Sequence, residues 1–322
     1  MTQAPLSGIE PRSVWSVLRP QVIPTTFVES ERLNRALQLE PGLLLVSEAF
    51  QHTGSFKYRA ALSVALHSQA SHLLTASSGN FGAALALAAS RTGKRCTVVM
   101  PAKSARVKVA AVRSAGAAVD LIDTKQITRA ARVDQLHQSD PSAQVVSPYD
   151  DPYVVAGNSS LGAELFAREI ADCVVVPVGG GGLSSGLVVA RDLLANSCQV
   201  IGAEPLLAND AARSIRAGRL CANDEEPSTL CDGARTLSLG KLNFAILREG
   251  LAGIIEVEES KIALAVQLLF QHANLKAEPT GALSLAAVLQ SPQRFASKRV
   301  ACIVSGGNVD PTLYAQLLLQ NG

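Results

Sequence analysis

One stretch decides the fold of this chain: Val174-Val175-Val176-Pro177-Val178-Gly179-Gly180-Gly181-Gly182-Leu183. Its first half is an apolar, mostly β-branched run, which is typical of a strand buried on both faces. Its second half places four glycines before a helical segment, and such a loop offers free backbone N–H groups with no side chains in the way. The stretch predicts a strand, a loop and a helix in succession, and the loop suits a phosphate group.

The same alternation of strand and helix extends along the chain from about Ser71, which predicts an α/β protein with a parallel sheet covered by helices. The predicted strands are 72–76, 95–100, 119–122, 173–178, 199–204 and 299–304. The predicted helices, with apolar residues recurring at three and four, are 82–92, 105–115, 183–195 and 261–272. Residues 222–243 mix acidic residues, proline and glycine, and are expected to form surface loops.

Composition narrows the class of protein. Of 322 residues, 48% are hydrophobic, enough to bury a sizeable core. The 29 basic residues nearly balance the 27 acidic ones, and a net charge of +2 argues against nucleic acid or a membrane as partner and favours a small metabolite. Six cysteines without a C-x-x-C pair are expected to be reduced thiols. Residues 1–20 lack the apolar run of a signal peptide, so the expected location is the cytoplasm.

A lysine stands where a turn leads into a helical run, in Thr53-Gly54-Ser55-Phe56-Lys57-Tyr58-Arg59. A cation at a helix start is unfavourable to the helix dipole. Lys57 is interpreted either as a solvated surface lysine or as a lysine whose pKa is lowered, so that its neutral amine attacks a carbonyl. The stretch alone leaves both interpretations open.

A second polar cluster, Thr75-Ala76-Ser77-Ser78-Gly79-Asn80-Phe81-Gly82, ends a predicted strand and opens a helix. Its hydroxyls, amide and free N–H groups suit a carboxylate or a phenolate oxygen. A simple helix N-cap made by serine or asparagine explains it equally well. A third cluster, Ile303-Val304-Ser305-Gly306-Gly307-Asn308, again follows a strand and by itself is typical of a turn.

The glycine loop does not follow the common nucleotide-binding patterns. Ser184 and Ser185 stand where G-x-G-x-x-G requires its third glycine, and the Gly-Lys-Ser of a P-loop is missing. Glu204 lies about where a ribose-binding acid belongs, so a nucleotide-dependent dehydrogenase remains an alternative, as does a binding module without catalysis. Both leave Lys57 and Asn80 unexplained.

Taken together, Ser55-Phe56-Lys57, Ser78-Gly79-Asn80, the four glycines and Ser305-Gly306-Gly307-Asn308 occur in the order and at about the spacing of the fold-type II pyridoxal-phosphate enzymes. The chain most resembles the serine/threonine dehydratase and serine racemase branch. The similarity spans nearly the whole length and includes Asp150-Asp151-Pro152, Ala203-Glu204-Pro205, Asp232-Gly233 and Glu278-Pro279-Thr280-Gly281. It implies a tryptophan synthase β-like fold of two open, twisted, mostly parallel sheets flanked by helices, with a large cofactor-binding domain (1–71 and 150–322) and a small domain (72–149).

The resemblance also implies site residues. Lys57 would carry pyridoxal 5′-phosphate as a Schiff base and then take the substrate's α-proton. The implied cofactor-binding residues are Phe56, Lys57, Asn80 at the phenolic oxygen, Gly179, Gly180, Gly181, Gly182 and Leu183 at the phosphate, and Ser305 at the pyridine nitrogen. A neutral hydroxyl at that nitrogen does not force its protonation, which favours elimination over transamination. The implied substrate-binding residues are Ser77, Ser78, Gly79 and Asn80.

The implied reaction is that of an ammonia-lyase (dehydratase), which converts a β-hydroxy amino acid such as serine, threonine, hydroxyaspartate or phenylserine into a 2-oxo acid and ammonia. Ser78 stands where racemases carry their opposite-face acid or base, so a serine-type racemase is the first alternative, and a β-replacement synthase is the second. Relatives are commonly dimers, and a homodimer is expected.

The resemblance implies a metal site in addition. Glu204, the carbonyl of Ala208 and Asp210 match the spacing at which racemase-like members bind Mg²⁺ or another hard divalent cation. The alternative is that both acids are ordinary loop residues.

Two departures from the family bear on substrate choice. Phe81 stands where many relatives carry histidine, and Asn158-Ser159-Ser160 replaces a Gln-Gly-Thr run, which predicts a pocket that is more apolar or differently shaped. The chain ends soon after Asn308, so no regulatory domain and no feedback inhibition are expected.

Overall fold

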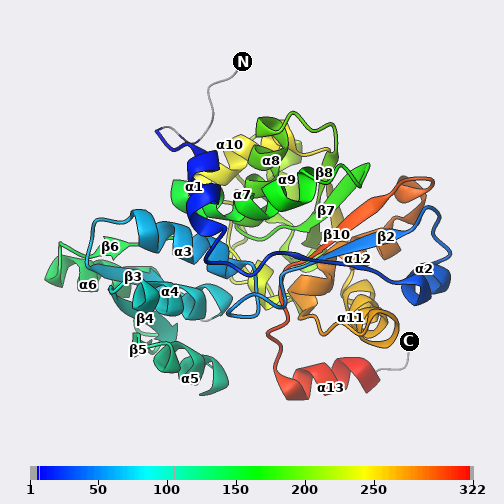
Figure 1. Ribbon diagram of the computed structural model, residues 1–322. Coiled ribbons are helices and arrows are strands. Elements are labelled where there is room, and N and C mark those ends of the chain that lie inside the picture. The colour runs from blue at the N-terminus through cyan, green and yellow to red at the C-terminus, as the bar shows by residue number, and fades with distance from the viewer. Residues whose placement is uncertain (1–5, 7, 78, 105, 320–322) are drawn as a thin grey trace.

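A computed structural model describes residues 6, 8–77, 79–104 and 106–319, which form a mixed α/β fold with two sheets (Figure 1). The larger sheet has the order β1-β2-β10-β7-β8-β9, and the smaller has the order β5-β4-β3-β6. Every neighbouring pair is parallel except β1 and β2, which are antiparallel. The predicted class and the mostly parallel sheets are confirmed.

The strands are β1 (Thr26–Glu29), β2 (Leu43–Ser47), β3 (His72–Ala76), β4 (Arg95–Pro101), β5 (Ala118–Ile122), β6 (Gln144–Val145), β7 (Cys173–Pro177), β8 (Gln199–Pro205), β9 (Ile254–Val257) and β10 (Val300–Val304). The helices are α1 (Pro11–Leu18), α2 (Glu31–Leu37), α3 (Lys57–His67), α4 (Asn80–Arg91), α5 (Arg106–Ser114), α6 (Arg129–Ser139), α7 (Pro152–Phe166), α8 (Gly182–Leu193), α9 (Asp210–Ala217), α10 (Lys241–Gly250), α11 (Glu259–Ala273), α12 (Pro279–Gln290) and α13 (Pro311–Leu319). Short 3-10 turns are η1 (Leu206–Ala208), η2 (Asp232–Ala234) and η3 (Pro292–Phe295).

The large sheet is buried on both faces, as the valine run predicts. Val174 and Val176 of β7 pack into the core shared with α1, α7, α8 and α10, whereas Cys173 and Val175 pack into the core shared with α2, α11 and α12. This alternation follows from the two-residue period of a strand. The carboxyl ends of β7, β8 and β10 consequently lie along one edge, where polar loops follow each strand.

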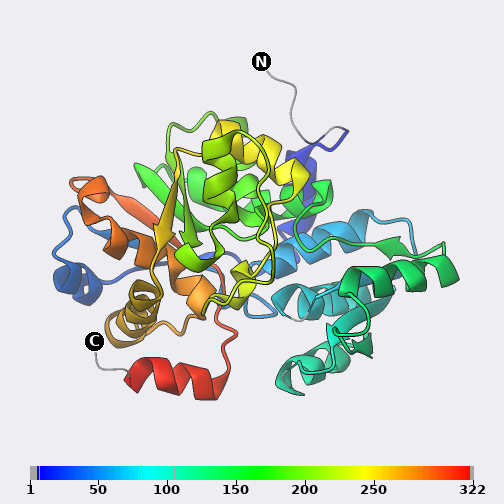
Figure 2. The ribbon, with the colours of Figure 1, turned by 180° about the vertical axis from the view of Figure 1, so that it is seen from behind.

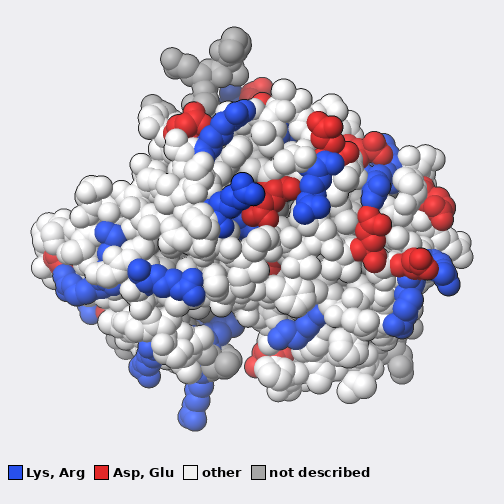
Figure 3. All heavy atoms as spheres, viewed as in Figure 1, with Lys and Arg blue, Asp and Glu red and all other residues white. Residues whose placement is uncertain are grey.

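The small sheet lies beside the large one, and α3 packs against α4 on one side and α7 on the other (Figures 1 and 2). All four of its strands come from the segment between His72 and Val145. We propose on this ground that residues 72–149 form the small domain and that 1–71 and 150–322 form the large one. Residues 72–149 carry ten basic and four acidic residues, and Lys and Arg predominate over this region in Figure 3.

The alternation pattern missed the first part of the large sheet. Leu43–Ser47 forms β2, whose five residues are all buried between β1 and β10. A short apolar run preceded by proline and glycine carries no periodicity that separates a strand from a buried helix turn. Residues 222–243 are largely loop, as expected, with η2 inside the segment and α10 starting at Lys241. No helix in the described part of the chain is long and apolar enough to span a bilayer.

Candidate active site

Lys57 is the first residue of α3 and is partly buried among apolar rings. Its Nζ donates to the carbonyl of Pro148 at 2.8 Å and lies 5.0 Å and 5.7 Å from the ring centroids of Phe56 and Phe81. Burial lowers the pKa of Lys57 to about 8, and the charge of Glu278 opposes that shift. Among the described residues Lys57 makes no ion pair. The interpretation as a solvated surface lysine is therefore wrong.

The end of β10 meets the turn before Lys57. The N–H of Phe56 donates to the carbonyl of Ser305 at 3.0 Å, and Ser55 forms a β-bridge with Gly306. Ser305 is buried, because it directly follows the central strand β10. Residues almost 250 positions apart in the sequence thus lie together at one edge of the large sheet.

Asn80 opens α4 and faces the same edge. Its Nδ2 donates to Oε1 of Glu278 at 2.8 Å, and its Oδ1 accepts from Nδ2 of Asn308 at 2.9 Å. Ser77 Oγ accepts from the N–H groups of Gly82 at 3.1 Å and Gly79 at 3.4 Å, so it caps this helix start. The capping interpretation and the binding interpretation are compatible, because the hydroxyl of Ser77 keeps its own hydrogen to donate. Ser78 lies outside the described residues.

The glycine loop lies between β7 and α8 and packs closely against its surroundings. A Cβ at Gly180 would lie 2.3 Å from the ring of Tyr149, and one at Gly181, where φ is +94°, would lie 2.7 Å from Cβ of Asn243. The carbonyl of Gly180 accepts from Nδ2 of Asn243 at 2.7 Å. With that carbonyl bound elsewhere, the N–H groups at the start of α8, including that of the buried Leu183, have no partner within the helix.

Glu278 is a residue of this cluster that we did not predict. It is 4% exposed, its N–H donates to the carbonyl of Gly306, and its carboxyl accepts from Asn80. Burial and then the charge of Asp232 raise the pKa of Glu278 to about 8, while the hydrogen bond from Asn80 opposes the shift. The sequence signal was its place before Pro279, but a glutamate there is equally typical of an ordinary helix cap.

The comparisons with known proteins agree with this geometry. The family described as "Pyridoxal-phosphate dependent enzyme" matches residues 18–306. The chain belongs to the pyridoxal-phosphate dependent enzymes. It is 33% identical to a serine racemase of Schizosaccharomyces pombe over 92% of either chain. It is 35% identical to an L-threo-3-hydroxyaspartate ammonia-lyase of Pseudomonas sp, covering 88% of this chain and 91% of that one.

Solved structures of pyridoxal-phosphate enzymes of this branch share the fold. A threonine deaminase from the source abbreviated T.th. superposes with a TM-score of 0.87 at 39% identity, covering 93% of this chain and 97% of the other. Maize serine racemase gives a TM-score of 0.88 at 29% identity, covering 95% and 94%. Membership of the serine/threonine dehydratase and racemase branch of fold type II is thereby confirmed.

Pyridoxal phosphate fits the described residues. A lysine amine that is largely neutral near pH 8 matches the aldehyde of the cofactor, and a loop of free N–H groups at a helix start matches its phosphate. The amide of Asn80 and the buried Ser305 offer hydrogen-bonding groups between these two ends.

The three residues predicted to hold a metal lie around the end of β8 and the start of α9. Both oxygens of Glu204 accept backbone N–H groups, from Ala211 and Ala212, at 2.8 Å each. Asp210 Oδ1 accepts from Asn223, and its buried Oδ2 has no partner among the described residues. Burial raises the pKa of Asp210 to about 6, and burial and then Asp210 raise that of Glu204. Within the described ranges, no three His, Cys, Asp or Glu side chains form a metal-binding group.

The substituted run 158–160 does not have the role that we expected. Ser159 Oγ accepts from Nε1 of Trp15 at 2.7 Å, and Ser160 Oγ accepts from Nη1 of Arg59 at 3.1 Å. These side chains lie inside α7 and join it to α1 and α3, so they serve packing rather than the shape of the pocket. Phe81, in contrast, is buried beside Lys57 and does form an apolar wall there.

Proposed function

We propose that the protein is a pyridoxal-phosphate dependent ammonia-lyase that acts on a β-hydroxy amino acid, such as serine, threonine, hydroxyaspartate or phenylserine, and releases a 2-oxo acid and ammonia. The observation that carries the proposal is Lys57, a partly buried amine without a carboxylate partner among the described residues and with a pKa lowered to about 8. The relatives named hydroxyaspartate ammonia-lyase and the threonine deaminase structure support this reaction class.

Bound pyridoxal phosphate would supply an electron sink for the negative charge that forms at the substrate's α-carbon. Lys57 would hold it covalently, Phe56 would pack beside it, the N–H groups of 179–183 would hold its phosphate, and Asn80 and Ser305 would contact its ring. The neutral hydroxyl of Ser305 leaves the ring nitrogen without a forced proton, which favours loss of a β-substituent.

The substrate's carboxylate would bind at the start of α4. Ser77, Ser78, Gly79 and Asn80 precede or open that helix, where N–H groups have no partner within the helix and the helix dipole favours an anion. Ser77 keeps a hydroxyl hydrogen to donate, because its oxygen already accepts from Gly82. A carboxylate held there turns the α-carbon toward Lys57, which lies beside Phe81 in the first turn of the same helix.

Lys57 Nζ would then take the α-proton, because it is the amine at the site and its lowered pKa keeps a large neutral fraction near pH 8. The C–O bond of the β-hydroxyl breaks, and the oxygen leaves with a proton as water. The aromatic faces of Phe56 and Phe81 exclude solvent from the amine during this transfer.

A second candidate function is amino-acid racemisation. The serine racemases among the relatives favour it, and so does a serine at position 78, which would return a proton to the opposite face of the α-carbon. A β-replacement synthase is a further alternative within the same family.

One incubation separates these functions. The purified, cofactor-loaded protein is incubated with L-serine, L-threonine, L-threo-3-hydroxyaspartate and phenylserine, and ammonia, 2-oxo acid and D-isomer are measured. We expect ammonia and 2-oxo acid in equal amounts from at least one substrate. D-isomer without oxo acid would favour the racemase, and no oxo acid from any substrate would overturn the lyase proposal.

We further propose that Glu204, the carbonyl of Ala208 and Asp210 hold Mg²⁺ or another hard divalent cation. The support is two buried carboxylates, of which Asp210 raises the pKa of Glu204 and keeps an oxygen without a partner among the described residues. Such a cation would neutralise the pair and hold the β8–α9 turn. Mg²⁺ is expected to raise the melting temperature of the wild type and to leave Asp210→Asn unchanged; an equal effect on both would contradict the site.

A homodimer and a cytoplasmic location are proposed on the family likeness alone. Light scattering of the eluting protein checks the first, because a monomer of 33.6 kDa and a dimer differ twofold in mass.

A further inference from the structure

The side chain of Asn80 is held by a second asparagine from the other end of the chain. Asn308 Nδ2 donates to the carbonyl of Thr53 at 2.7 Å and to Oδ1 of Asn80 at 2.9 Å. A backbone carbonyl only accepts hydrogen bonds, so the atom of Asn308 that faces Thr53 must be its nitrogen. The orientation of the Asn308 amide is therefore fixed by the backbone.

The orientation of Asn80 follows from that of Asn308. The NH₂ of Asn308 uses one hydrogen on Thr53 and offers the other to Asn80, so the atom of Asn80 that it meets must be the oxygen. The nitrogen of Asn80 then faces Glu278, where the distance is 2.8 Å. One hydrogen of this NH₂ binds Glu278, and one remains free for an acceptor in the site.

The fold makes room for this arrangement at Gly54. Its φ is +72°, and a Cβ there would lie 2.4 Å from Oδ1 of Asn308. The carbonyl of Gly54 also accepts from the N–H of Gly307 at 2.9 Å, which fixes the backbone beside Asn308. A glycine is needed here both for the backbone conformation and for the close approach of the Asn308 side chain.

We propose that Asn308 is a positioning residue that sets which way the amide of Asn80 points, so that the NH₂ of Asn80, and not its oxygen, faces Glu278 and the phenolic oxygen of the cofactor. This inference rests on the proposed function. Without Asn308 the Asn80 amide can turn over, and its oxygen would then repel an anionic phenolic oxygen.

Asn308→Asp is the sharpest test, since it keeps the shape and replaces the donor with acceptors. Asn308 is exposed, so solvent accommodates the new charge. An aspartate cannot donate to Thr53 or to Asn80, and it attracts the NH₂ of Asn80 away from the cofactor. We expect the dissociation constant of pyridoxal phosphate to rise about tenfold and the visible absorbance maximum to shift in the direction that Asn80→Ala gives.

Two further variants complete the test. The double variant Asn80→Ala with Asn308→Asp should shift no further than Asn80→Ala alone, because Asn308 acts through Asn80. Asn196→Asp is the matched control, since Asn196 also donates to a backbone carbonyl, that of Phe166, yet lies away from the site. It should leave both readouts unchanged.

The outcomes separate the two proposals. A wild-type absorbance band and affinity in Asn308→Asp, together with a shifted Asn80→Ala, would overturn the positioning role and leave the proposed function standing. A wild-type band in Asn80→Ala would overturn the contact that Asn308 is proposed to set. A wild-type protein that takes up no pyridoxal phosphate would overturn the proposed function and this inference together.

Discussion

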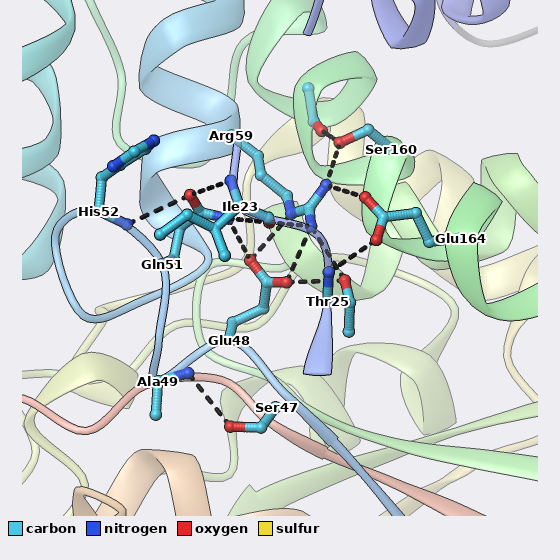
Figure 4. Close-up of polar contacts among 11 residues, drawn as sticks. Ile23, Thr25, Ser47, Glu48, Ala49, Gln51, His52, Arg59, Ser160 and Glu164 are labelled. Atoms are coloured by element: carbon cyan, nitrogen blue, oxygen red, sulfur yellow. Dashed lines mark hydrogen bonds and ion pairs between the residues drawn. The ribbon is translucent and has the colours of Figure 1, made fainter. Parts of the chain in front are cut away.

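Lys57 and Arg59 lie two residues apart on the first turn of α3, yet they have opposite surroundings. Arg59 is 0% exposed, and its guanidinium binds Glu48 at 2.8 and 3.0 Å, Glu164 at 2.7 Å and Thr25 Oγ1 at 2.9 Å (Figure 4). Lys57 has one carbonyl and two aromatic rings. Although burial lowers it, the pKa of Arg59 is raised overall by Glu48 and Glu164, whereas that of Lys57 falls to about 8.

The difference teaches how to separate a structural cation from a reactive one. A buried charge with every donor satisfied stays charged and ties elements together, and here Arg59 joins α3 to β2, α7 and the segment before β1. A buried amine without a carboxylate loses its proton more easily and becomes a nucleophile. Because α3 carries both residues, the paired cation holds in place the helix that presents the unpaired one.

Removing the unpaired cation should give the largest functional effect. Lys57→Ala is expected to lose the visible absorbance of bound cofactor and to lower the rate of 2-oxo acid formation by at least about 10³-fold, because covalent attachment and proton transfer both end. Its melting temperature should not fall. A variant that keeps colour and activity would show that the two cations have been assigned the wrong roles.

Removing the paired cation should chiefly affect stability. Arg59→Met leaves Glu48 and Glu164 without their cation, and the free energy of unfolding is expected to fall by about 3–5 kcal/mol. Urea denaturation measures it. Arg35→Met is the matched control, because its ion pair with Glu31 is exposed and its loss should change the stability by at most about 0.5 kcal/mol. Equal effects of the two substitutions would contradict the comparison.

The two carboxylates of the Arg59 cluster should differ from each other. Glu48 is 1% exposed and binds the guanidinium through both oxygens, whereas Glu164 is 30% exposed. Glu48→Gln is expected to cost about 2–3 kcal/mol, as for a buried bond to a charged group, and Glu164→Gln about 1 kcal/mol. The same denaturation experiment ranks them, and the reverse order would mean that burial does not set the strength of these pairs.

The smallest predicted effect is one of pH. The neutral amine is the nucleophile, so the rate at which cofactor-free protein binds pyridoxal phosphate should rise about tenfold between pH 7 and pH 9 and then level off, as a lysine pKa near 8 requires. Stopped-flow absorbance measures the rate. A rate that is still rising steeply at pH 10 would show that the surroundings of Lys57 do not lower its pKa.

The sequence allowed prediction of those site residues that directly follow a strand or open a helix. Ser305 and the glycine loop each follow a buried valine-rich or isoleucine-containing strand, and the edge of a parallel sheet brings such ends together. Lys57 needed the family resemblance, because Lys57 and Arg59 look alike in the sequence. Only the folded chain shows that two carboxylates surround Arg59, and that among the described residues none pairs with Lys57.

Glu278 and Asn308 could not be assigned roles from the sequence for a related reason. Each acts through Asn80, a contact across 198 and 228 residues, and no local pattern encodes such a pairing. The strand β2 was missed because its burial depends on neighbours from both ends of the chain.

The most direct test of the account is to trap the cofactor on the protein. Borohydride makes the bond between pyridoxal phosphate and a lysine amine permanent, and peptide mass spectrometry then locates it. We predict a single modified peptide, with the added mass on Lys57, and none in Lys57→Ala. A label on any other lysine, or a protein without label, would contradict the central claim that the unpaired cation of α3 is the one that holds the cofactor.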